Sequence, residues 1–159
     1  MIVRKYTAAD IADMIEIWNE VIEEGNAFPQ EKMLDEEAAE EMFASQSYTG
    51  VAEAGGRIQG LYILHPNNIG RCGHICNASY AVRSEKRGLH IGEKLVADCI
   101  DKAMELGFRI LQFNAVVESN AAARHLYEKF GFKQLGTIPQ GFRMKDGHYD
   151  NICPYYLEL

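Results

Sequence analysis

The sequence contains no apolar run approaching the roughly 20 residues of a membrane-spanning helix. Residues 1–5 also lack the long apolar core of a secretory signal, so we expect a cytosolic protein that contacts no membrane. Positive charge is scarce: 16 lysines and arginines stand against 23 aspartates and glutamates, and the formal net charge is −7. An acidic chain without a basic run is a poor candidate for binding nucleic acid, and we predict no such partner.

Metal-binding patterns are missing as well. The chain has four cysteines, and Cys72, His74 and Cys76 lie close together. Their spacing matches no common zinc pattern, and no partner Cys/His pair follows elsewhere, so we expect no metal. Reduced structural thiols are the default in a cytosolic protein.

Two familiar phosphate-binding signatures are absent. The glycines near position 90 do not form an early G-x-G-x-x-G with an acidic residue some 20 positions later, which a dinucleotide-binding fold requires. No Gly-Lys-Ser/Thr follows them, which excludes a Walker loop. Any phosphate ligand must therefore be held in another way.

No repeat, linker or low-complexity segment divides the 159 residues, and we expect a single domain over residues 1–159. Periodicity and turn residues predict helices over residues 7–25, 35–45, 91–107 and 120–130. They predict strands over residues 2–6, 48–54, 58–64, 74–82, 110–117, 132–138 and 149–157. The order β-α-α-β-β-β-α-β-α-β-β favours an α/β fold with a mixed sheet rather than a doubly wound parallel one.

The most informative segment is residues 87–92, Arg-Gly-Leu-His-Ile-Gly, between a predicted strand and a predicted helix. The helix carries its apolar face on Ile91, Leu95, Cys99, Ile100, Ala103, Met104 and Leu106. A strand that turns through glycines into a helix N-terminus presents unpaired N–H groups, and the helix dipole adds partial positive charge. Such a cradle suits a pyrophosphate.

Two motifs together resemble the GNAT superfamily of acetyl-CoA-dependent N-acetyltransferases. Its signature Q/R-x-x-G-x-G/A is similar to residues 87–92, with Arg87 first, Gly92 last, and His90 where glycine is usual. Residues 120–132 resemble the family's N-x-x-A-x-x-L-Y-x-x-x-G-F ending. Elements at residues 73–80, 113–114, 136–139 and 149–150 are similar to phosphinothricin-type acetyltransferases and to fungal acetyltransferases of proline analogues. Both groups modify amines of small amino-acid-like molecules.

The resemblance implies a set of cofactor contacts. Backbone amides of Arg87, Gly88, Leu89, His90, Ile91 and Gly92 would hold the pyrophosphate of acetyl-CoA. The strand ending in Tyr80, Ala81 and Val82 would splay from its neighbour, pair with the pantetheine arm and, as a catalytic contribution assigned to Val82, offer a backbone N–H to the thioester oxygen.

Two residues of the second motif have alternative roles. Asn120 would bond the pantetheine arm, although capping the helix would alone explain an asparagine there. Tyr127 would act as general acid by protonating the leaving thiolate. The alternative for Tyr127 is an ordinary aromatic core residue, since Leu126, Phe130 and Phe132 surround it in sequence.

The acceptor side is less determined. Asn77 and Asn114 are amides in apolar strands, where they could bind substrate or merely pair with each other. Phe28 is expected to wall the acceptor pocket, unless its segment is an ordinary interhelical loop. Glu118, His74, Asp150 or a water relay could serve as the base.

These features predict an acyltransferase that moves acetyl from acetyl-CoA to the amine of a small amino acid or analogue, by direct attack in a ternary complex. Acetylation of a protein N-terminus or lysine, and a non-catalytic acyl-CoA sensor, remain alternatives. Similar enzymes are often homodimers, and by analogy a homodimer is the assembly that we consider for this protein.

Overall fold

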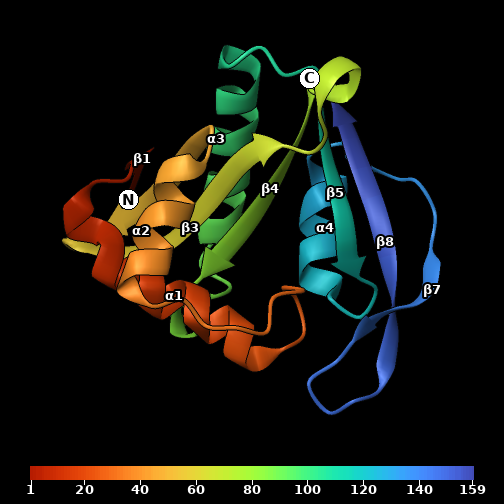
Figure 1. The fold of residues 1–159 in the computed structure, drawn as a ribbon, viewed down its shortest axis with the longest axis horizontal. Coiled ribbons are helices and arrows are strands. Elements are labelled where there is room, and N and C mark those ends of the chain that lie inside the picture. The colour runs from red at the N-terminus through yellow and green to blue at the C-terminus, as the bar shows by residue number, and fades with distance from the viewer.

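The computed structural model describes all 159 residues, and its strands form one mixed sheet (Figure 1). The strand order is β1-β2-β3-β4-β5-β8-β6, and β7 pairs with β8. The helices are α1 (Ile11–Glu24), α2 (Glu36–Ser45), α3 (Ile91–Glu105) and α4 (Ala121–Lys129). The strands are β1 (Ile2–Lys5), β2 (Tyr48–Ala54), β3 (Arg57–Pro66), β4 (Ile75–Val82), β5 (Ile110–Val117), β6 (Lys133–Gln134), β7 (Ile138–Arg143) and β8 (Tyr149–Glu158). The predicted mixed α/β fold is confirmed.

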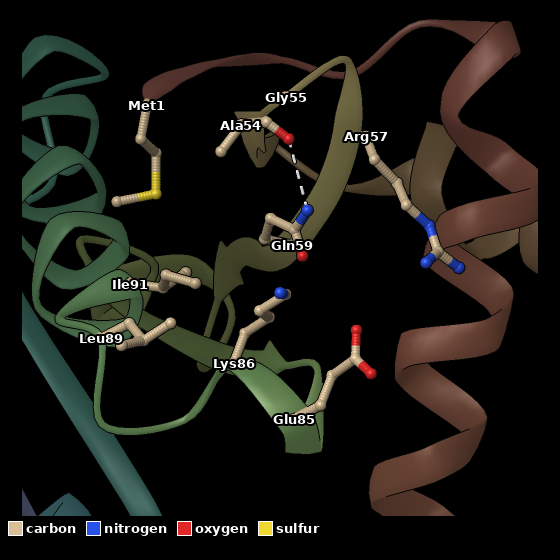
Figure 2. Close-up of a pocket in the computed structure, with 9 residues that line it drawn as sticks. All are labelled: Met1, Ala54, Gly55, Arg57, Gln59, Glu85, Lys86, Leu89 and Ile91. Carbon is tan, nitrogen blue, oxygen red and sulfur yellow. Dashed lines mark hydrogen bonds between the residues drawn. The ribbon is translucent and has the colours of Figure 1, made fainter.

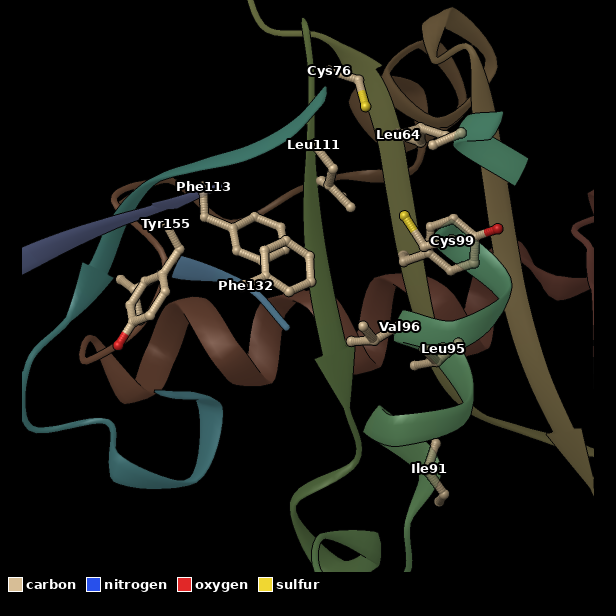
Figure 3. Close-up of a cluster of buried hydrophobic side chains, with 14 of the residues drawn as sticks. Leu64, Cys76, Ile91, Leu95, Val96, Cys99, Leu111, Phe113, Phe132 and Tyr155 are labelled. Atoms are coloured by element: carbon tan, nitrogen blue, oxygen red, sulfur yellow. The ribbon is translucent and has the colours of Figure 1, made fainter. Parts of the chain in front are cut away.

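Helices cover both faces of the sheet, and each face has its own cluster of buried side chains. On one face α1 and α2 pack over β2 and β3, around fully buried Trp18, Phe43 and Leu61. On the other face α3 packs over β2, β3 and β4, and the cluster extends to aromatic rings on β5, β8 and the segment after α4 (Figure 3). Phe113 and Phe132 stack there with ring centroids 4.8 Å apart.

The sheet is split between β4 and β5. These strands run parallel and pair only at Ile75 with Ile110 and Cys76 with Leu111. On its other side β4 pairs with β3 along its whole length up to Val82. Beyond the two pairs, β4 and β5 diverge toward their carboxyl ends, so the edge of β4 that faces β5 carries no ladder hydrogen bonds. The predicted splay of the central strands is therefore present.

Two predictions from the sequence are wrong in detail. The strand expected over residues 132–138 is a two-residue β6, and β7 is a separate strand starting at Ile138. Residues 135–137, with Gly136 among them, lie between the two strands, and Pro139 within β7 has no N–H to donate, so the β7–β8 register is irregular beyond Ile138. Met104 and Leu106, expected on the apolar face of α3, are 48% and 49% exposed, since the buried stripe ends at Ala103.

Gly60 on β3 permits the close approach of α3 to the sheet. A Cβ built there would lie 2.9 Å from the carbonyl oxygen of Ala81, 3.0 Å from Leu95 Cδ1 and 3.1 Å from Ile91 Cγ2. The backbone oxygen cannot move without disturbing the β3–β4 pairing. Glycine at this position therefore sets where the N-terminal part of α3 lies.

We expect Gly60→Ala to lower the free energy of unfolding by about 1–3 kcal/mol, because the added methyl overpacks the helix–sheet contact. Urea denaturation monitored by circular dichroism measures it. Gly92→Ala on α3 is the matched control, since its Cβ would meet only Leu126 Cδ2, at 3.6 Å. Equal stability of the two variants would contradict this account of Gly60.

Candidate functional site

The open end of the split is flanked by the N-termini of two helices. The chain leaves β4 at Val82 and enters α3 at Ile91, while β5 ends at Val117 and α4 begins at Ala121 (Figure 1). Because β4 and β5 are parallel, both helices start near the same edge of the sheet. Each start carries partial positive charge from its dipole. A crevice outside the carboxyl ends of parallel strands is where α/β proteins commonly bind ligands.

Consecutive amides between β4 and α3 lack protein partners. The N–H groups of residues 88–92 make no hydrogen bond within the chain. The Arg87 N–H, which was expected to belong to the same set, donates instead to the carbonyl of Ser84 at 3.3 Å. The cradle formed by the structure therefore begins at Gly88, one residue later than the sequence prediction.

His90 immediately precedes α3 in a left-handed conformation, with φ 61° and ψ 18°. Most L-residues avoid this region, whereas glycine enters it freely and histidine is among the more tolerant side chains. This gives a backbone reason why glycine is usual at this motif position. The exposed His90 ring contacts Glu93 in the first turn of α3, with Nδ1 3.1 Å from the carboxylate.

The connection that carries the cradle is attached to α1 by two carboxylates. Glu20 accepts a 3.0 Å hydrogen bond from the Ser84 N–H and a further one from the Ser84 hydroxyl. Glu24 pairs with the Arg87 guanidinium at 2.9 Å. The hydrogen bonds from Ser84 hold the pKa of the Glu20 carboxyl below its usual range. Because Glu24 pairs with Arg87, the charge of the Arg87 side chain is balanced within the protein.

Arg83 extends this attachment into the interior. Its side chain is only 5% exposed, donates to the carbonyl of Ile58 at 2.8 Å and pairs with Asp13 at 2.8 Å. Sequence reasoning missed these contacts. Their signal was the run of acids on α1 at positions 13, 16, 20 and 24, but such spacing is usual for a solvated helix face.

Aromatic rings line the α4 side of the split. Tyr127 lies 4.4 Å from Phe113, 6.3 Å from Tyr80 and 6.1 Å from Tyr155, measured between ring centroids. Its side chain is half-buried and its hydroxyl makes no hydrogen bond within the chain. Burial raises the pKa of the Tyr127 phenol above its ordinary value, which makes the phenol a weaker acid than a free tyrosine. The ring is thus part of the aromatic cluster while the hydroxyl remains free.

Tyr80 carries one of three side-chain polar atoms that are buried without a partner, the others being on Gln46 and Gln59. Tyr80 lies on β4 beyond the last residue that pairs with β5. Burial raises the pKa of its hydroxyl well above the ordinary value. A buried orphan hydroxyl is costly unless something else satisfies it. Asn120, by contrast, caps α4 as predicted, its Oδ1 accepting from the Ala123 N–H at 3.2 Å.

A row of side-chain amides lies on the other side of the split. The Asn77 Nδ2 donates to the carbonyl of Gln112 at 2.8 Å, directly after the last paired residues. The Gln112 Nε2 donates to Asn114 Oδ1 at 3.1 Å, and the Asn114 Nδ2 donates to Asn67 Oδ1 at 2.7 Å. Asn77 and Asn114 therefore do not pair with each other, so the mutual pairing considered from the sequence does not occur.

The segment after α1 contacts the β7–β8 hairpin, which belongs to the other half of the sheet. The Lys145 N–H donates to the carbonyl of Gly25 at 3.1 Å, and its ammonium to the carbonyl of Glu23 at 2.7 Å. Phe28, in the same connection, is buried against Trp18 with ring centroids 4.5 Å apart. Its ring belongs to the core cluster on the α1 side.

The three candidate bases occupy different environments. His74 precedes the closed end of the split, about 20 Å along β4 from Tyr80 at 3.3 Å per residue. Hydrogen bonds from Ser119 and Asn151 lower the pKa of Asp150, which makes it a weaker base. Glu118 follows β5 directly at the open end and accepts from Asn151 Nδ2 at 2.7 Å.

A separate pocket of about 550 Å³ lies on the outer side of the loop before α3, toward the β2–β3 hairpin (Figure 2). Lys86 and Glu85 bring charges of opposite sign to it, Arg57 is paired with Asp13 and Glu16 on α1, and Leu89 and Ile91 supply apolar surface. None of its lining residues belongs to β5 or α4, but Leu89 and Ile91 also belong to the cradle, so the pocket adjoins the cradle on the side away from the split. No group of three or more His, Cys, Asp or Glu could hold a metal, and no helix is long and apolar enough to span a bilayer.

Comparison with known proteins identifies the family. Residues 11–132 match the acetyltransferase (GNAT) family, and the chain belongs to it. The N-acetyltransferase aca1 of Schizosaccharomyces pombe is 33% identical over 96 residues, which are 60% of this chain and 46% of that protein. The chain therefore spans about half the length of this curated relative.

Solved structures of family members superimpose over nearly the whole chain. A GCN5-related N-acetyltransferase from Kribbella flavida is 31% identical, with a TM-score of 0.92 and coverage of 99% of this chain and 97% of that one. A ribosomal-protein-alanine N-acetyltransferase from Brucella melitensis is 26% identical, with a TM-score of 0.93 and full coverage of both chains. A Sinorhizobium meliloti phosphinothricin acetyltransferase, solved with acetyl-CoA, shares the fold at 21% identity and a TM-score of 0.92, covering 99% and 88%.

The Glu20–Ser84 contact generates a prediction about pH. A carboxyl whose pKa is lower in the folded state stabilises the fold above its ordinary pKa, and that stability is lost as the pH falls through the folded value. The melting temperature of Glu20→Gln should therefore fall less than that of the unmodified protein between about pH 5 and pH 3. Glu41→Gln, an exposed carboxyl on α2 without an ion pair, is the control. If the melting temperatures of Glu20→Gln and of the unmodified protein fall equally over this pH range, the Glu20–Ser84 contact does not have the proposed effect on stability.

Proposed function

We propose that this protein transfers acetyl from acetyl-CoA to the amine of a small molecule, an amino acid or analogue, by direct attack within a ternary complex. The observation that carries the proposal is the split between β4 and β5, with free backbone amides at its mouth. Membership of the acetyltransferase family supports it.

The cradle suits the pyrophosphate of acetyl-CoA for three reasons. Gly88, Leu89, His90, Ile91 and Gly92 offer unpaired N–H groups at a helix N-terminus. The nearby Arg87 side chain is committed to Glu24, so recognition depends on backbone dipoles. Gly92 has an ordinary helical backbone and room for a Cβ, so the protein's own packing does not require glycine there. Close approach of a ligand would require it.

The open edge of β4 is suited to the pantetheine arm. Tyr80, Ala81 and Val82 have no ladder partner on the side of β5, so their backbone groups can pair with the amides of that arm. Asn120 can contribute through its amide nitrogen, because only its oxygen is used in the cap. We assign to the Val82 N–H the stabilisation of charge on the thioester oxygen during attack.

In the proposed reaction a neutral amine forms a C–N bond to the acetyl carbon while the C–S bond breaks. Tyr127 donates its phenolic proton to the departing sulfur, because the phenol is protonated at neutral pH. The amine loses a proton to a base, for which Glu118 at the open end is favoured over His74 and Asp150.

The acceptor is proposed to lie on the amide-lined side of the split. Asn77 and Asn114 there are neutral and present hydrogen-bonding groups, which suits a small zwitterion better than a bare cation. The likeness to a ribosomal-protein-alanine acetyltransferase favours a second candidate, the N-terminal amine of a protein.

A thiol-release assay with acetyl-CoA and a panel of free amino acids, polyamines and peptides separates the candidates. Turnover of amino acids alone is the expected result. Turnover of peptides alone would favour the second candidate, and binding of acetyl-CoA without any turnover would leave a non-catalytic sensor.

We expect Gly92→Glu to abolish acetyl-CoA binding, because its side chain brings bulk and negative charge to the cradle. Isothermal titration calorimetry measures the affinity, and circular dichroism checks the fold. Gly92→Ala, which fits the free protein, should bind with an intermediate affinity. Unchanged affinity in a folded Gly92→Glu variant would show that the cradle holds no phosphate.

Tyr127→Phe should lower kcat by about 10²-fold, while the Kd for acetyl-CoA changes little, because only the proton donor is lost. Steady-state kinetics and calorimetry give the two numbers. Tyr155→Phe is unsuitable as a control because its hydroxyl bonds α4, so Tyr48→Phe on β2 serves instead. If Tyr127→Phe retains full kcat while chemistry limits the rate, Tyr127 is a packing residue.

A further inference from the structure

Helix α4 carries two residues of the proposed site, Asn120 at its cap and Tyr127 within it, yet it is weakly embedded. It has nine residues and none of them is fully buried. A helix this short has little stability of its own, so its orientation depends on specific contacts with its surroundings.

Arg124, on the same helix, makes three hydrogen bonds to the half of the sheet that contains β5, β6 and β8. Its Nε donates to the Tyr155 hydroxyl on β8 at 3.1 Å. One terminal nitrogen donates to the carbonyl of Glu118, just after β5, at 3.2 Å, and the other to Gln134 Oε1 on β6 at 3.2 Å. A single side chain therefore connects α4 to two strands, β8 and β6, and to the residue that follows β5.

The network returns to the helix. The Tyr155 hydroxyl donates to Glu128 Oε1 at 3.1 Å, so it bonds α4 at positions 124 and 128, one turn apart. Tyr127 lies beside this contact, with its ring centroid 6.1 Å from that of Tyr155. Two attachment points on one turn fix the rotation of the helix about its own axis, and this rotation decides where Tyr127 points.

We propose that Arg124 is a positioning residue for the acetyl transfer, which aims the Tyr127 phenol into the split without contacting the reactants. The inference rests on the proposed function. Arginine suits the role because its rigid planar fork can serve three acceptors at once. Lysine, a flexible point charge, could retain only part of the network. An error of about 1 Å in the placement of a reacting group can cost on the order of 10²-fold in rate.

The test is a double-mutant cycle between Arg124→Met and Tyr127→Phe, with kcat as the readout. We expect Arg124→Met alone to lower kcat by about 10²-fold, and Arg124→Lys by a smaller factor. In the Tyr127→Phe background the same changes should lower kcat by less than about 3-fold, because there is no longer a proton donor to aim. Calorimetry should show a Kd for acetyl-CoA changed far less than kcat.

Arg4→Met is the matched control. Arg4 is also a paired arginine, bonded to Asp10 and Glu53 at 2.8 Å, but it lies on β1, away from the split. The Arg4→Met substitution should lower the melting temperature and leave kcat unchanged. If Arg124→Met fails to fold, Arg124→Lys carries the cycle alone.

Two results would overturn the inference, and they differ from each other. If Tyr127→Phe slows the reaction but the Arg124 variants slow it further by an equal factor, positioning fails while the proposed acid stands. If Tyr127→Phe leaves kcat unchanged, the acid assignment fails and the positioning of Tyr127 fails with it.

Discussion

Only two residue pairs join β4 to β5, and the arrangement of the rest of the site depends on this short parallel contact. A longer pairing would close the sheet and leave no free strand edge. No pairing would leave the two halves without a common frame. Where the backbone pairing stops, the Asn77 side chain makes a hydrogen bond to β5, and the two strands separate beyond it. The helices that follow β4 and β5 then bring their N-termini to the same mouth.

Electrostatics and backbone geometry combine at that mouth. The chain is acidic overall, but the α1 carboxylates are paired with the connection before α3 rather than directed at a ligand. The arginines there are neutralised in the same contacts. What remains for an anion is the unpaired Lys86 and a set of oriented amides, and such amides bind phosphate without requiring a positively charged protein. Selectivity for the ligand thus depends on shape and distance more than on net charge.

Much of the fold and of the candidate site could be predicted from the sequence, because the sequence patterns that indicate them are local. The glycine-bordered turn before α3 and the Asn120 cap are short-range patterns, and they identified both motifs correctly. The interruption at Gly136 and Pro139 was visible, but its effect depends on how β8 pairs with both neighbours. The Glu20 and Lys145 contacts and the Arg124–Tyr155 bond join residues that are distant in sequence, so no periodicity reveals them. Arg124 in particular is one polar residue among several on a short helix, and only the folded chain shows its three acceptors.

The split sheet has a consequence for how the molecule resists unfolding. Backbone pairing joins its halves at only two residue pairs, and side chains supply further contacts: the Asn77 amide, the Asn114–Asn67 hydrogen bond, and the buried cluster that continues from α3 to Phe113. A ligand lying along the open edge of β4 would act as the strand that the protein does not provide, and would bind only the assembled form. Mass action then makes the free energy of unfolding rise with the concentration of that ligand.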